Sequence, residues 1–548
     1  MANRPMLMFE PSAWGEYFIS PNPMPCELQA SVKERRDELV DEVRQLISQC
    51  LADRNLFSAM KMIDAIERLG VHYHYHTEIN KLVDTLNNAT EKELLSKETD
   101  KDTNLFAVAL RFRILRQNHV DAPCDVFHSI MNENGELNDM LHYSVEDLLS
   151  LYEAAFHGKP NERFLESVKT FSSDSLLKQV ESGKLSEPIL LKVRHALTMP
   201  AHRGMKRLAA KLYIPIYEKD DECNQVILEL AKLDFHMVLL MHHEEVKHLS
   251  LWYKELDGVS TLSYIRNRPI VCYFWALGVF YEPHYKKARL MFSKIIKLFS
   301  LFDDTYDSYG TLEELYRFDQ AIQSWDEESA KHVGQNFGII MSLLNKTLEE
   351  FVYDGASALG IDCTKFIIKK VSKCMHQEVA WRETGTVPSL DDHLSVTMIS
   401  TFYWALACIS FCGMSENEAK NPEVFSWVEE FPTIIRNACL ISRLMDDISG
   451  HETEKGRNNV ATAVTCYAKD HGKTERDSKE ALWCLVEDQW KSINKEFLSN
   501  TIIPTSMLTR IINLARVMES MYKHCDGYTH SSRIKESMGK VLDECVLH

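Results

Sequence analysis

Apolar residues recur with the 3.6-residue period of an α-helix along nearly the whole chain, and no segment keeps up the alternation of a β-strand. Between residues 37 and 51, for example, Leu39, Val43 and Ile47 lie on one helical face. Glycine and proline, which interrupt helices, number only 20 and 16 among 548 residues. The sequence therefore predicts an all-α protein.

Length and interruptions in the pattern predict two domains. A chain of 548 residues is longer than one hydrophobic core normally organises. Pro215 and the charged run from Glu218 to Glu222 interrupt the apolar periodicity near the middle of the chain. We expect an N-terminal helical domain at 1–220 and a C-terminal helical domain at 221–548.

Charge excludes some partners. The net charge of −18 repels nucleic acid and anionic membrane surfaces. The uncharged stretch from Leu394 to Ser415 is long enough to span a bilayer, but six Ser, Thr and Gly residues interrupt it. We therefore interpret this stretch as one buried core helix and expect no membrane partner.

The N-terminus and the cysteines indicate a cytoplasmic protein. The first residues become acidic by Glu10 and contain no apolar signal segment. The 14 cysteines form no CxxC pair and no regular spacing, as expected for reduced thiols.

An acidic cluster ends one strongly apolar helical face. Phe292, Ile296 and Phe299 continue, at helical spacing, into Asp303 and Asp307. Carboxylates four residues apart repel each other on a helix, and a divalent cation such as Mg²⁺ would remove that repulsion. By itself the cluster, which also includes Asp304, fits a solvated acidic helix end equally well.

A second helical face repeats this change from apolar to acidic. Ile435, Cys439 and Ser442 lead at spacings of four and three into Asp446, and Glu454 lies eight residues further on. Two carboxylate helices make a metal pocket plausible, because Mg²⁺ held by few carboxylates keeps coordination positions for phosphate oxygens.

A pair of arginines precedes an aromatic helix. In an extended segment Arg266 and Arg268 share a side, and two guanidinium groups match the geometry of phosphate. Trp275 follows within a run of apolar and aromatic residues, and the face of a Trp ring can stabilise a cation. Taken alone, the arginines also fit a solvated surface pair.

The joint spacing of these motifs resembles the plant terpene synthase family. Arg268 and Trp275 lie 35 and 28 residues before Asp303, as in the RxR, Trp and DDxxD arrangement of that family. Further matches extend from the N-terminus to the C-terminus: Arg4-Pro5 with Trp14, Arg443 three residues before Asp446, Lys455 and Arg457, and the segment Asp526-Gly527-Tyr528. One position departs from the family, because Gly450 replaces the Ser or Thr of the second metal motif.

The resemblance implies a class I terpenoid synthase bundle in the C-terminal domain and an α-barrel-like, non-catalytic N-terminal domain, since no DxDD motif is present. It implies three Mg²⁺ ions, for which Mn²⁺ can substitute. The implied metal ligands are Asp303, Asp304, Asp307, Asp446 and Glu454. The implied diphosphate groups are Arg266, Arg268, Arg443, Lys455 and Arg457. The implied hydrocarbon-facing residues are Trp275, Phe402, Tyr403 and Tyr528, and Asp526 is an implied substrate-binding residue of the pocket lining. Of these, the resemblance assigns catalytic roles to Arg266, Trp275, Asp303, Arg443 and Tyr528.

The sequence therefore predicts a monomeric, cytoplasmic, Mg²⁺-dependent sesquiterpene synthase that ionises farnesyl diphosphate. Three alternatives stay open at this point. The chain could be a helical interaction protein of degenerate enzyme ancestry, a synthase preferring a C10 or C20 prenyl diphosphate, or a chain-elongating prenyltransferase. The last would require a second complete DDxxD motif.

Overall fold

The computed structural model describes residues 9–19, 26–90, 93, 104–132, 138, 143–326, 328–329, 332–414, 421–455 and 460–546. Regular structure in these residues is helical, and they contain no β-strand. This confirms the predicted all-α class. The chain forms two compact units, which are described separately.

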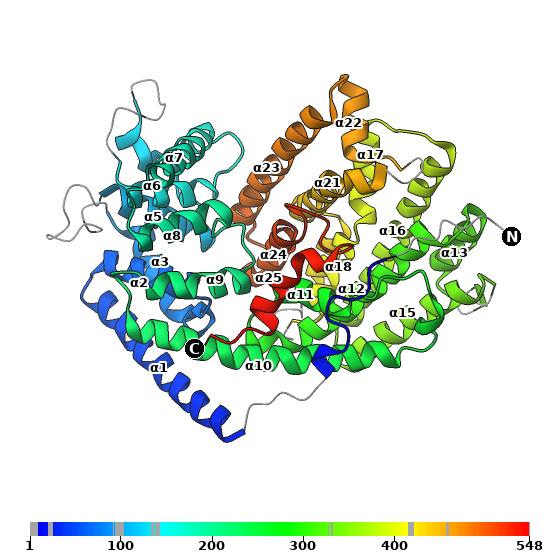
Figure 1. Cartoon of the computed structure of the whole chain (residues 1–548), viewed down its shortest axis with the longest axis horizontal. Coiled ribbons are helices and arrows are strands. Elements are labelled where there is room, and N and C mark those ends of the chain that lie inside the picture. The colour runs from blue at the N-terminus through cyan, green and yellow to red at the C-terminus, as the bar shows by residue number, and fades with distance from the viewer. Residues whose placement is uncertain are drawn as a thin grey trace. The chain divides into compact units, whose positions relative to one another are not determined.

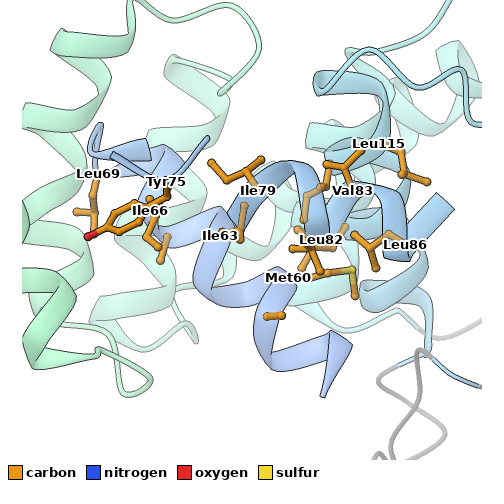
Figure 2. Packing of buried hydrophobic residues seen from close by; sticks show 14 of the residues in the cluster. Met60, Ile63, Ile66, Leu69, Tyr75, Ile79, Leu82, Val83, Leu86 and Leu115 are labelled. Atoms are coloured by element: carbon orange, nitrogen blue, oxygen red, sulfur yellow. The ribbon is translucent and has the colours of Figure 1, made fainter. Parts of the chain in front are cut away.

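The N-terminal unit comprises most of residues 22–241. Figure 2 shows its core, where Met60 and Ile63 of one helix pack near Ile79 and Leu82 of the next. Ile79, Leu82, Val83 and Leu86 follow the helical spacing of 3, 4 and 7, which places their side chains on one buried face. The helices of this unit are α1 (Cys26–Ala52), α2 (Leu56–Arg68), η2 (His72–His74), α3 (His76–Asn88), α5 (Asn104–Gln117), η4 (Cys124–Ile130), α6 (Val145–Ala155), α7 (Arg163–Ser182), α8 (Glu187–Thr198) and α9 (Lys206–Glu218), and α10 (Gln225–Glu255) begins in it.

The C-terminal unit contains the predicted functional motifs. In this unit α12 packs against α11, α15 and α18, and α21 packs against α17, α18 and α24, as can be followed in Figure 1. Its elements are η1 (Tyr17–Ile19), η5 (Val259–Thr261), α11 (Pro269–Val279), η6 (Pro283–Tyr285), α12 (Lys286–Ser308), α13 (Leu312–Ser324), α15 (Gln335–Tyr353), α16 (Ala358–Thr384), α17 (Leu390–Ser400), α18 (Tyr403–Cys412), α20 (Pro422–Glu429), α21 (Thr433–Lys455), α22 (Ala463–His471), most of α23 (Glu475–Ser499), α24 (Thr505–Tyr522), η7 (Ser531–Ile534) and most of α25 (Lys535–Leu542).

The two units divide within a helix. The charged run Glu218–Glu222 ends α9 and begins the turn before α10, which then continues to Glu255. The boundary between the two units lies within α10, between residues 241 and 242. It is later in the chain than the predicted boundary at 220/221. The described N-terminal residues 9–19 belong to the C-terminal unit, where the main-chain oxygen of Glu10 accepts a hydrogen bond from Arg268 at 3.0 Å.

The apolar stretch predicted as one helix from Leu394 to Ser415 is two helices, so that prediction was wrong in part. α17 ends at Ser400, and Phe402 has a φ of +62° before α18 begins. The stretch Leu390–Cys412 has a mean hydropathy of 1.6 and the length of a membrane span, yet 67% of its most apolar window is buried in the protein. Ser415 lies outside the described residues. The break places Thr401 and Phe402 beside a cavity of the C-terminal unit.

Candidate active site

A cavity of about 630 Å³ lies inside the C-terminal unit and is lined by side chains from α11, α12, α16, α17, α18, α21 and α24. Acidic, basic and aromatic groups all line it. The structure brings these sequence-predicted residues to the cavity wall: Arg266, Trp275, Asp303, Asp307, Phe402, Tyr403, Arg443, Asp446, Gly450, Glu454, Asp526 and Tyr528.

The first acidic cluster occupies the C-terminal end of α12. Asp303 and Asp307 lie one turn apart and both face the cavity. Removal from water and the charge of Asp307 raise the pKa of Asp303 to about 7. Asp304 is buried, and its carboxylate instead accepts hydrogen bonds from the main-chain N–H and Nε–H of Arg266, at 2.7 and 2.6 Å.

The second acidic series lies on α21. Asp446, Gly450 and Glu454 all line the cavity at intervals of four residues. Burial raises the pKa of Asp446 well above its usual range, and the neighbouring Asp526 and Glu454 carboxylates add to the effect, although Arg443 opposes it. A Cβ atom added at Gly450 would have no neighbour within 4 Å.

The donor set fits hard divalent cations. The cavity gathers carboxylate oxygens from two helices, where burial and neighbouring carboxylates raise the pKa of Asp303 and of Asp446. Oxygen ligands of this kind suit Mg²⁺. Asp303, Asp307, Asp446 and Glu454 are the residues that would hold such ions.

The two arginines before α11 occupy different environments. The Arg266 guanidinium lies at the cavity and donates to Asp303 and Asp304, at 2.6 Å in each case. Arg268 is buried beside the cavity, where its guanidinium donates to the carbonyl oxygens of Tyr528 and Thr529 at 3.0 and 2.9 Å. In this structure Arg266 therefore faces the acidic cluster, whereas Arg268 ties the C-terminal segment to the start of α11.

Lys455, the last residue of α21, is not brought to the cavity. Lys455 forms an ion pair with Glu475 at 2.6 Å and does not line the cavity wall. Arg457, Arg4 and Pro5 lie outside the described residues.

Aromatic rings also line the cavity. The Trp275 ring has its centroid 6.1 Å from each of the rings of Tyr403, Tyr522 and Tyr528. These side chains are buried, so cations in this region would meet ring faces rather than water. Tyr522 received no role in the sequence interpretation, yet it lines the cavity.

Sequence reasoning missed two charged residues on α16. Glu378 and Arg382 line the cavity one turn apart, and burial raises the pKa of Glu378. Arg382 donates to the main-chain oxygens of Tyr306 and Asp307 at 3.3 and 3.4 Å, so it caps the end of α12. Met375, Glu378 and Arg382 lie on one face at helical spacing. This change from an apolar to a charged face is the sequence pattern that could have identified the two residues.

A buried ion pair between His393 of α17 and Asp447 of α21 lies at the cavity wall. His393 Nε2 lies 2.8 Å from Asp447 Oδ2, and the same carboxylate accepts from the main-chain N–H of Ala463 at 2.6 Å and from Arg443 at 2.9 Å. Burial opposes the charge on His393, but Asp447 outweighs it and raises the pKa of His393 to about 9. Arg443 and His393 in turn overcome the burial of Asp447 and lower its pKa to about 2.

This pair predicts a pH-dependent stability. Because the pKa of His393 is raised by folding, its contribution is complete below about pH 6.5 and is lost as the pH rises through about 9. In metal-free buffer, the difference in unfolding free energy between wild type and His393→Phe should shrink by about 2 to 3 kcal/mol between pH 6 and pH 10. Urea denaturation followed by circular dichroism measures it. The control His332→Asn, at a residue whose side chain is 75% exposed, should show no such change. Equal differences for His393→Phe at both pH values would contradict the pair.

Comparisons with known proteins agree with this geometry. Residues 254–492 match the model of the terpene synthase family, metal binding domain, and residues 13–197 match that of the terpene synthase N-terminal domain. The chain is 36% identical over 549 residues to germacrene C/D synthase of Valeriana officinalis, covering 99% of this chain and 96% of the relative. It is 34% identical over 546 residues to alpha-humulene synthase of Zingiber zerumbet, covering 98% and 96%.

Two solved structures are similar over most of the chain. Limonene synthase with 2-fluorolinalyl diphosphate superimposes with a TM-score of 0.90 at 26% identity, covering 99% of both chains. Isoprene synthase from grey poplar leaves (Populus x canescens), in complex with three Mg²⁺ ions and dimethylallyl-S-thiolodiphosphate, has a TM-score of 0.86 at 27% identity, covering 94% of this chain and 98% of that one.

Proposed function

This chain belongs to the terpene synthase family, and we propose that it uses Mg²⁺ to ionise farnesyl diphosphate and cyclises the resulting carbocation to a sesquiterpene hydrocarbon or alcohol. Its enzyme class is that of a carbon–oxygen lyase acting on diphosphates. The observation that carries the proposal is one cavity whose wall combines carboxylates, arginines and aromatic rings.

The charged groups of the cavity would receive the diphosphate. Arg266 and Arg443 are the cationic side chains that would orient it, and both are placed in advance by buried carboxylates, Asp304 and Asp447. When bound, Mg²⁺ would neutralise diphosphate charge and stabilise it as a leaving group. The C1–O bond would break with its electron pair leaving on the diphosphate, so that an allylic cation forms.

The aromatic groups would hold the hydrocarbon chain and the cation. Trp275, Tyr403 and Tyr528 present ring faces in a buried region, which favours charge on carbon over capture by water. Loss of a proton or a controlled addition of water would end the reaction. Relatives that match nearly the whole chain carry the name sesquiterpene synthase, which supports a C15 substrate for this chain.

The test is a product assay. Purified protein with farnesyl diphosphate and Mg²⁺ should release a C15 hydrocarbon or alcohol that gas chromatography with mass spectrometry identifies. Geranyl and geranylgeranyl diphosphate, assayed in parallel, should give lower kcat/KM. If none of the three substrates gives a product in the presence of Mg²⁺, the result would favour an interaction protein. Release of a longer prenyl diphosphate would indicate chain elongation. We also propose, from the sequence, a cytoplasmic monomer.

Gly450 gives a prediction about the metal requirement. Gly450→Ser is expected to keep the reaction class and to lower the Mg²⁺ concentration for half-maximal rate by about 5-fold, the equivalent of about 1 kcal/mol for one added oxygen donor. The cavity has room for this side chain, since nothing lies within 4 Å of the added Cβ. Gly450→Ala is the matched control, because it adds the Cβ without the oxygen. An unchanged Mg²⁺ titration in Gly450→Ser would refute this role for the position.

A further inference from the structure

A fully buried lysine lies on α12, two turns before its acidic C-terminal end. Lys297 is 0% exposed and precedes Asp304 by seven residues, so the two lie on one face of the helix. The cavity-lining residues of α12, among them Ile296 and Asp303, do not include it. In the part of the chain that the structure describes, no carboxylate forms an ion pair with Lys297. Burying an ammonium group in this way is costly, so its contacts need explanation.

Lys297 contacts the main chain of the cavity arginine. Its ammonium group donates to the carbonyl oxygen of Arg266 at 2.5 Å, and it lies 5.3 Å from the ring centroid of Tyr253. Burial lowers the pKa of Lys297 to about 8, with Cys272 and Asp304 favouring the charge and Arg266 and Arg268 opposing it. A pKa near 8 leaves the group mainly protonated at pH 7.

The same residue, Arg266, is fixed on its other side by Asp304. The carboxylate of Asp304 accepts from the Arg266 main-chain N–H at 2.7 Å, while Lys297 holds the carbonyl oxygen. Both neighbouring groups come from α12. Residues 262–268 between η5 and α11 form no helix of their own, so these main-chain contacts hold the loop, while Asp303, Asp304 and Thr529 contact the guanidinium itself.

We propose that Lys297 is a positioning residue that fixes the loop of Arg266 and thereby places its guanidinium for diphosphate binding. The proposal rests on the proposed function only for the identity of the natural substrate. The buried ammonium group of Lys297 restricts the loop of Arg266 before the substrate binds. Binding therefore costs little further conformational entropy. Misplacement of such a group by about 1 Å can cost up to about 100-fold in rate.

The chain offers a closely matched control. Lys294 lies one turn earlier on α12, is 7% exposed, forms an ion pair with Glu350, and lies 5.3 Å from the Trp252 ring. It therefore shares the burial and the aromatic contact of Lys297 without touching the arginine loop. Lys294→Met reports the general cost of removing a buried lysine from this helix.

The first experiment measures binding of inorganic pyrophosphate in the presence of Mg²⁺ by titration calorimetry, which needs no turnover. Lys297→Met is expected to weaken Kd by about 10-fold, and Lys294→Met by less than about 2-fold. If Lys297→Met does not fold, Lys297→Gln, which keeps a donor, replaces it and should recover at least part of the affinity of wild type. An unchanged pyrophosphate Kd in a folded Lys297→Met protein would overturn the proposal. This outcome does not depend on which prenyl diphosphate is the natural substrate.

The second experiment asks whether Lys297 acts through Arg266. In a double-mutant cycle, adding Lys297→Met to Arg266→Met should change the pyrophosphate Kd by less than about 2-fold, because the group to be positioned is already absent. A further loss of about 10-fold in that background would show an independent effect and would overturn the positioning role. Turnover should follow the same pattern, with KM for farnesyl diphosphate rising in Lys297→Met.

Discussion

Asp303→Asn is expected to lower kcat/KM with farnesyl diphosphate by about 1,000-fold or more, because electrostatic groups at the reacting centre each contribute on this scale. Asp303 and Asp307 are the two α12 carboxylates of this motif that face the cavity. An amide of the same shape removes a charge without opening a space, so the loss would report the charge itself. Steady-state kinetics across a range of Mg²⁺ concentrations measures it, and the Mg²⁺ for half-maximal rate should rise.

The control for this variant is Asp391→Asn, at an exposed residue in the first turn of α17 that does not line the cavity. It should keep wild-type kinetics. The circular dichroism spectrum of Asp303→Asn should match that of wild type, since the pKa of Asp303 near 7 indicates that its charge is poorly stabilised in the metal-free protein. Wild-type activity in Asp303→Asn would refute the metal role of the motif.

Local spacing predicted the helices and the orientation of the acidic groups. Asp303 and Asp307 continue the stripe of Phe292 and Phe299, and the structure places them on the cavity face of α12. The same reasoning failed between Ser400 and Tyr403, where no Gly or Pro marks a break. Phe402 adopts a left-handed conformation that costs roughly 1–2 kcal/mol. Its ring stacks on the ring of Phe299 with a centroid-to-centroid distance of 4.4 Å. This is a tertiary contact that no local sequence pattern contains.

Long-range partners explain the other differences. Arg268 was predicted beside Arg266, but its guanidinium is used by carbonyl oxygens of Tyr528 and Thr529, about 260 residues later in the chain. Lys455 likewise pairs with Glu475, the first residue of α23. Sequence spacing can place a charged group on a helix or loop, whereas its partner depends on which distant segment packs there.

Arg443→Met is expected to lower kcat with farnesyl diphosphate by about 100- to 1,000-fold, the scale measured when one preorganised donor to a developing negative charge is removed. Arg443 lines the cavity, and its guanidinium lies 2.9 Å from Asp447 and 3.3 Å from Asp446. Its Nε is buried and has no hydrogen-bond partner in the described part of the chain.

The design separates the charge of Arg443 from its shape and from its place on α21. Arg443→Lys keeps the charge but loses the planar fork, so its kcat should fall between those of wild type and Arg443→Met. Arg436, an exposed residue two turns earlier on the same helix, contacts Phe431 and does not line the cavity, and Arg436→Met should stay within about 2-fold of wild type. His393 still holds Asp447 in every variant, which preserves the helix packing. Equal losses in Arg436→Met and Arg443→Met would mean that α21 stability, and not stabilisation of the departing diphosphate, sets the rate.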